Sequence, residues 1–136
     1  MSITIGSVVL DGASLPVWVD EFGRGSDLVG QVESVSITGA LVIQASAQQA
    51  GRRLTLQGRR EGNRVIGAVS RAELNALRAL SQVPDATYTV VLHDGREFEA
   101  MFRRTDGPAV EGEDVLDQQP VDAGDYLIPT IRMVLV

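Results

Sequence analysis

The sequence predicts a mainly β fold with one short α-helix. Three observations support this class. Most of the 136-residue chain alternates apolar and polar residues with a period of two, and glycine-containing turns separate the alternating segments. A single segment has the longer period of an amphipathic helix. The length suits one domain over residues 1–136, because domains most often contain roughly 100–150 residues.

The N-terminal third contains the first predicted strands. Residues 3–10 alternate around Ile3 and Ile5 and indicate one opening strand, which ends at Asp11 and Gly12. A short apolar piece follows over 15–19, where Pro16 favours a sheet edge or a strand start. Residues 21–28 hold glycines and charges and are predicted to form a loop.

The middle of the chain contains strand signals of a different kind. Residues 29–38 alternate less regularly, and residues 40–43 (Ala-Leu-Val-Ile) are apolar enough to predict burial on both faces. In the next predicted strand, Leu54 and Leu56 are expected to face inward. Residues 58–63 indicate a polar, arginine-rich turn, after which Val65 and Ile66 are expected to resume the sheet.

One helix is predicted over residues 71–82. Ser70 and Glu73 have the spacing of a capping box, in which each side chain binds the other residue's backbone N–H. An apolar stripe follows at helical spacing, formed by Leu74, Leu77 and Leu80. The helix is therefore expected to lie against a sheet.

A β-hairpin is predicted directly after the helix. A two-residue turn at Asp94 and Gly95 would scatter its apolar residues over both faces. A three-residue loop, with Gly95 left-handed in a bulge, places them all on one face, and register follows the buried face. We therefore predict the three-residue loop, with one apolar face formed by Tyr88, Val90, Leu92, Phe98, Ala100 and Phe102.

The C-terminal region combines an acidic segment with a closing strand. Residues 105–125 are acidic, contain no arginine, and indicate mostly loop with a short strand near 109–115. Residues 126–136 predict a strand tied into the sheet. The chain has no cysteine, which excludes disulfides and thiolate sites, and no leader or transmembrane segment is expected.

Candidate chemical sites are weak. Ser70, His93 and Asp94 supply the residue types of a hydrolase triad, but Ser70 is better explained as a helix cap and His93 lies at a turn. The acidic segment lacks the spacing of a calcium loop, and no glycine-rich nucleotide motif is present. We expect no enzyme activity, no metal and no cofactor.

The charges predict surfaces instead. The net charge is −6, and all twelve cations are arginine; a GC-rich coding sequence explains this, and arginine also suits bidentate pairs at interfaces. The arginine edge and the acidic segment are interpreted either as a solvated turn and a solvated loop, or as candidate subunit contacts between neighbouring copies. In the second case two different patches in contact give a ring or filament. The candidate interface residues are Arg52, Arg53, Arg59, Arg60 and Arg64 with Glu111, Glu113, Asp114 and Asp117.

Several segments in order resemble small tail proteins of bacteriophages with long non-contractile tails. These are ITIGxxVL at 3–10, RLTLQG at 53–58, SRAELxAL at 70–77, ATYT at 86–89, HDGR at 93–96 and DYxxPTIR at 125–132. The resemblance implies a β-sandwich or β-barrel flanked by one short α-helix. It also implies a distal tail protein located in the virion, which links tail tube to tail tip as a homohexameric ring. Its partners would be further copies of itself and the neighbouring tube and tip proteins, without membrane insertion.

The resemblance leaves alternatives open. One is the tail-tube subunit, which usually needs a long hairpin or loop reaching the next ring. Only residues 105–125 offer one in the sequence, and this favours the distal ring. Another is a small binding or assembly module, for which the chain has few aromatic residues to spare. DNA would contact the protein only while it passes through the ring, and an acidic channel would repel it.

Overall fold

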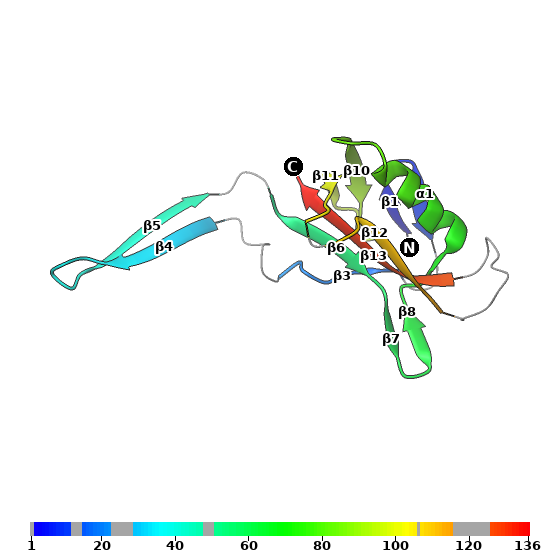
Figure 1. Ribbon diagram of the computed structural model, residues 1–136, viewed down its shortest axis with the longest axis horizontal. Coiled ribbons are helices and arrows are strands. Elements are labelled where there is room, and N and C mark those ends of the chain that lie inside the picture. The colour runs from blue at the N-terminus through cyan, green and yellow to red at the C-terminus, as the bar shows by residue number, and fades with distance from the viewer. Residues whose placement is uncertain (1, 12–14, 23–28, 48–50, 106, 116–125) are drawn as a thin grey trace.

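Antiparallel strands and one helix build the fold (Figure 1). The computed structural model describes residues 2–11, 15–22, 29–47, 51–105, 107–115 and 126–136. The elements are β1 (Ser2–Ile5), β2 (Val8–Asp11), β3 (Val17–Trp18), β4 (Val29–Val35), β5 (Leu41–Ala47), β6 (Arg53–Gln57), β7 (Arg59–Glu61), β8 (Arg64–Ile66), β9 (Val69–Ser70), α1 (Arg71–Ser81), β10 (Thr87–Val91), β11 (Glu97–Phe102), β12 (Val110–Asp114) and β13 (Tyr126–Leu135). The predicted mainly β class with one short helix is confirmed.

The strand β13 lies at the centre of the main sheet. The sheet has the order β2-β1-β10-β11-β13-β6-β3, and β12 and β9 also pair with β13. On one edge of β13, β12 pairs with 127–131 and β11 with 133–135; on the other, β9 pairs with 126–127 and β6 with 130–134. The predicted closing strand is therefore confirmed, and it joins both halves of the sheet.

The helix α1 packs on the sheet as its capping signals predict. The Glu73 N–H donates to Ser70 Oγ at 3.3 Å, and the Glu73 carboxylate accepts from the Ser70 N–H. Partial burial raises the pKa of Glu73, and the backbone hydrogen bond opposes that rise. Leu74 and Leu77 are buried in one apolar cluster with residues of β1, β2, β6, β10, β11 and β13.

The β10–β11 hairpin has the predicted three-residue loop. The Leu92 N–H donates to the Arg96 carbonyl at 2.9 Å, and the Gly95 N–H donates to the Leu92 carbonyl at 3.0 Å. Gly95 has a φ of +91°, the left-handed conformation that this loop requires and that glycine adopts without strain. Val90 lies opposite Phe98, which confirms the expected single apolar face.

Three parts of the fold differ from the sequence-based expectation. Residues 3–10 form two strands instead of one, because Gly6 adopts a φ of +59° and turns the chain back between Ile5 and Val8. Val65 and Ile66 pair with β7 in a separate hairpin and do not rejoin the main sheet. The third difference is in the pair β4–β5, because the burial predicted for residues 40–43 at the start of β5 is wrong. In the described part of the chain these strands pair only with each other and project from the body (Figure 1).

Candidate functional site: a projecting hairpin and its anchor

The β4–β5 hairpin exposes aliphatic side chains on both faces. Val35 lies opposite Leu41 on one face, and on the other Val32 lies opposite Gln44. Val32 is 66% exposed and Val35 70%. Glu33 is the only charged residue in the sequence from 29 to 47. The hairpin is therefore a nearly uncharged apolar surface in water, and the exposed aliphatic residues along it are Val29, Val32, Val35, Ile37, Leu41, Val42 and Ile43.

Hydrogen bonds order the tip of this hairpin. The Ser36 N–H donates to the Ala40 carbonyl at 2.8 Å, and the Gly39 N–H donates to the Ser36 carbonyl at 2.9 Å. Gly39 has a φ of +85°, so the loop has the same geometry as the β10–β11 loop. The Ser36 and Thr38 hydroxyls share a further hydrogen bond of 3.0 Å. The tip thus holds its side chains in a defined arrangement.

The described segments that flank the hairpin, residues 17–22 and 51–57, are joined to each other in the main sheet and are called its base here. Before the hairpin, Trp18 pairs with Leu56, and the Val19 N–H donates to the Thr55 carbonyl at 3.0 Å. Asp20 then accepts from Thr55 twice, from the N–H at 3.0 Å and from Oγ1 at 2.8 Å. Because β6 follows the hairpin in sequence, these bonds join its incoming and outgoing chain segments.

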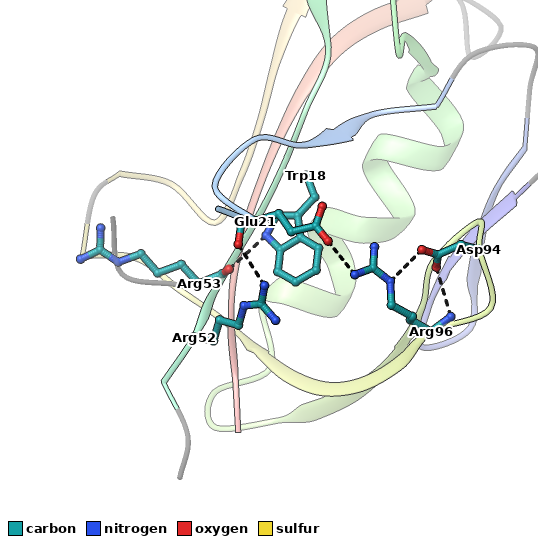
Figure 2. Close-up of polar contacts among 6 residues, drawn as sticks. All are labelled: Trp18, Glu21, Arg52, Arg53, Asp94 and Arg96. Carbon is teal, nitrogen blue, oxygen red and sulfur yellow. Dashed lines mark hydrogen bonds and ion pairs between the residues drawn. The ribbon is translucent and has the colours of Figure 1, made fainter. Parts of the chain in front are cut away.

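An anchor cluster of Trp18, Glu21, Arg52, Asp94 and Arg96 reinforces this junction (Figure 2). The Trp18 Nε1–H donates to the Arg53 carbonyl at 3.1 Å. The guanidinium groups of Arg52 and Arg96 lie 4.6 Å and 5.5 Å from the centroid of the Trp18 ring, within the range of cation–π attraction. Arg52 also donates to the Glu21 carbonyl at 2.9 Å. Arginine and tryptophan therefore connect β3, β6 and the β10–β11 loop.

Arg96 links two acidic residues from separate segments. Its guanidinium lies 2.6 Å from the Glu21 carboxylate and 2.7 Å from that of Asp94. The Arg96 backbone N–H, and then its guanidinium, stabilise the Asp94 carboxylate and lower the pKa of Asp94. The hydrogen bond from Arg96 to Glu21 is the main cause that raises the pKa of Arg96. The ion pairs thus hold the β10–β11 loop against the segment before the hairpin.

The predicted arginine edge is divided between two places. Arg52 and Arg53 belong to the base of the projecting hairpin, as described above. Arg59, Arg60 and Arg64 lie on the β7–β8 hairpin and are exposed. Arg59 pairs with Glu61 at 3.1 Å along the same strand. Sequence proximity therefore does not place the five arginines on one surface.

The predicted acidic segment makes contacts within its own chain. Glu111 pairs with Arg132 at 2.7 Å, and Asp114 pairs with Arg71 at 3.4 Å. Arg60 donates to the Asp114 carbonyl at 3.4 Å and to that of Val115 at 3.2 Å, so part of the arginine edge meets part of the acidic segment without a second copy. Glu113 is exposed, and Asp117 lies outside the described residues. Contact of these residues with a neighbouring copy stays a prediction.

The residues of the weak triad do not come together. Ser70 pairs with Tyr126 at one end of β13, whereas β11 pairs with the other end and places His93 beyond it. The two ends of β13, Tyr126 and Leu135, are nine residues apart, and nine residues of extended strand span roughly 30 Å. Among the described residues no cluster of acidic or histidine side chains suits a metal ion, and no described helix is long and apolar enough to cross a membrane.

The comparisons with known proteins add no family. No protein-family model matches the chain, and no curated protein sequence or solved structure is significantly similar to it. The class that the fold defines is a mainly β protein with a projecting apolar hairpin. Sequence reasoning missed that hairpin and most of its anchor, although the aliphatic run at 40–43 was the available signal.

Proposed function

We propose that the chain is a self-assembling structural subunit of a bacteriophage tail, without enzymatic activity. It forms a homomeric ring, expected to be a hexamer, that links the tail tube to the tail tip. The observation that carries the proposal is the β4–β5 hairpin, which leaves aliphatic side chains exposed on both faces while its base is firmly anchored. The resemblance of the sequence to small tail proteins supplies the kind of assembly.

The proposal is supported by the unfavourable free energy of exposing an apolar surface to water. Each aliphatic side chain that becomes fully buried contributes about 1.5–3 kcal/mol. An exposed two-stranded apolar hairpin is also a template for contact with another chain. The low charge of the hairpin favours a neutral partner surface. Contact between the hairpin and a neighbouring subunit removes the unfavourable exposure of these aliphatic side chains to water.

The hairpin also bears on the choice between a distal-ring protein and a tail-tube subunit. The distal ring was favoured because residues 105–125 were the only segment expected to reach a neighbouring ring. The β4–β5 hairpin is a second such segment (Figure 1), so the tail-tube subunit is now supported equally. Cryo-electron microscopy of virions distinguishes them: six copies at one level indicate the distal ring, and many stacked rings indicate the tube.

The partners and place of the chain follow from the same proposal. Neighbouring copies and the adjacent tube and tip proteins are the contacts, in a virion assembled in the bacterial cytoplasm. DNA passes through the ring without being bound. A small binding or assembly module is the second candidate function, because a single projecting hairpin also suits capture of one unlike partner.

Self-assembly is tested by removing the apolar surface of the hairpin. The triple variant Val32→Ser, Val35→Ser, Leu41→Ser is compared with Val9→Ser, which changes an exposed valine of β2. Light scattering should give multimers for the wild type and for Val9→Ser, and a monomer for the triple variant. Each variant should unfold within about 0.5 kcal/mol of the wild type, as surface substitutions usually do. A wild type that stays monomeric over the whole concentration range contradicts self-assembly.

A further inference from the structure

Ile37 is an isolated apolar knob at the hairpin tip. Its side chain is fully exposed. The hydrogen bonds between Ser36, Gly39 and Ala40 fix the turn that carries it. A side chain held in this way loses little conformational freedom when it enters a pocket, because the backbone is already ordered.

An apolar cavity lies beside the anchor cluster. Its volume is about 260 Å³. Glu21, His93 and Arg96 are its polar lining residues, and the ion pair between Glu21 and Arg96 holds two of them in place. Apolar cavities of about 150 Å³ already accommodate benzene, so this one has room for an isoleucine side chain. The apolar walls are Ile3, Leu15, Pro16, Val17, Trp18, Leu56 and Leu92.

The hairpin tip does not reach the cavity of its own chain. Each of the two strands has seven residues, which extend roughly 23 Å at about 3.3 Å per residue. The residues that line the cavity belong to β1, β6, the β10–β11 loop and the segment around β3. The hairpin tip projects away from this part of the molecule (Figure 1). Apart from Gly39 and its two chain neighbours, no described residue has an atom within 4 Å of a Cβ built on Gly39. An occupant from the tip must therefore come from another copy.

We infer that Ile37 of one copy docks in the cavity beside Trp18 of a second copy. This inference rests on the proposed self-assembly and specifies its contact. The tip and the cavity are different patches, so the contact is heterologous, and each copy still offers one free tip and one free cavity. The geometry therefore propagates from copy to copy and closes into a ring when the rotation between copies permits it.

Two blocking variants test the contact. Ile37→Asp puts a charge on the knob, and Val17→Arg fills the cavity from a wall residue that is 49% exposed, so neither change enters the core. Each variant alone should associate at least about tenfold more weakly than the wild type, a difference of 1.4 kcal/mol. An equal mixture should form a heterodimer and stop there, because one intact tip meets one intact cavity. Gln44→Asp, which adds the same charge to the hairpin shaft, should assemble normally.

The absence of cysteine permits a second measurement on weakly associating chains. Ile37→Cys mixed with Val17→Cys should give a disulfide-linked dimer under mild oxidation, whereas Ile37→Cys mixed with Val9→Cys should not. A disulfide-linked dimer of Ile37→Cys alone would indicate tip-to-tip contact and overturn the inference.

The outcomes separate the two proposals. Normal assembly of both blocking variants, with loss of assembly in the hairpin serine variant, refutes the tip-in-cavity contact alone. If the wild type does not associate and the mixed Ile37→Cys and Val17→Cys chains do not cross-link, self-assembly and the contact are refuted together.

Discussion

Replacing Trp18 with alanine should destabilise the protein by about 3–5 kcal/mol, the usual cost of removing a buried tryptophan. Trp18 is only 8% exposed, and its ring packs against that of Phe98 in a T-shaped arrangement at a centroid distance of 5.7 Å. Trp18→Phe keeps an aromatic ring but loses the hydrogen bond to the Arg53 carbonyl, worth about 1 kcal/mol. It also weakens the contact with the two arginines by about 0.5–1 kcal/mol. We therefore expect a cost of roughly 1–2 kcal/mol for phenylalanine.

The assay is urea unfolding followed by circular dichroism, because Trp18 is the only tryptophan and its fluorescence disappears with it. Phe22→Ala is the matched control, since Phe22 lies in the same segment but is 92% exposed. It should change the unfolding free energy by no more than about 0.5 kcal/mol. If Trp18→Ala costs no more than Phe22→Ala, then Trp18 does not anchor the hairpin base. Equal losses for Trp18→Ala and Trp18→Phe would show that packing of the ring contributes nothing.

Three further predictions concern other parts of the structure. Gly58→Ala should cost about 1–3 kcal/mol in calorimetry, because an added Cβ would lie 2.9 Å from the Ile66 carbonyl oxygen; an unchanged melting temperature would disprove this close packing. Asp94 has a lowered pKa, so its stabilisation is present above the ordinary aspartate pKa and is lost as pH falls through the lowered value. Thermal unfolding should therefore separate wild type from Asp94→Asn at neutral pH and not in strong acid. Arg59→Glu with Arg60→Glu should fold normally but fail to enter tails, and normal incorporation in virions would remove the arginine edge as an interface.

Local signals predicted the parts of the fold that local geometry determines. The capping box at Ser70 and Glu73 located the start of α1 because both partners lie within one helical turn. The register of the β10–β11 hairpin followed from the choice that buries one face. The turn at Gly6 is not predicted from the alternation within each strand, although the buried apolar positions change from odd (Ile3, Ile5) to even across it. A period of two identifies strands and does not show where one ends.

The anchor cluster was beyond such reasoning. Trp18 and Arg53 are 35 residues apart, and Glu21 and Arg96 are 75 residues apart. Only the order of strands in the sheet brings them together, and that order depends on β13 pairing on both of its edges. Arg52 and Arg53 were predicted as surface residues because they were grouped with nearby arginines in sequence. Pairing of β3 with β6 gives them a different environment from Arg59 and Arg60.

The error at β4–β5 has a separate physical cause. Apolar residues predict that a surface is removed from water, and they do not predict which chain covers it. The run at 40–43 predicts burial on both faces, yet the described chain leaves Leu41 and Ile43 exposed. An isolated two-stranded hairpin is marginally stable in water. The bonds from Asp20 to Thr55 fix only its base, so its outer part depends on its own ladder and tip until another surface meets it. Anchoring at the base and apolar exposure beyond it are together what a subunit needs if its last contacts form on assembly.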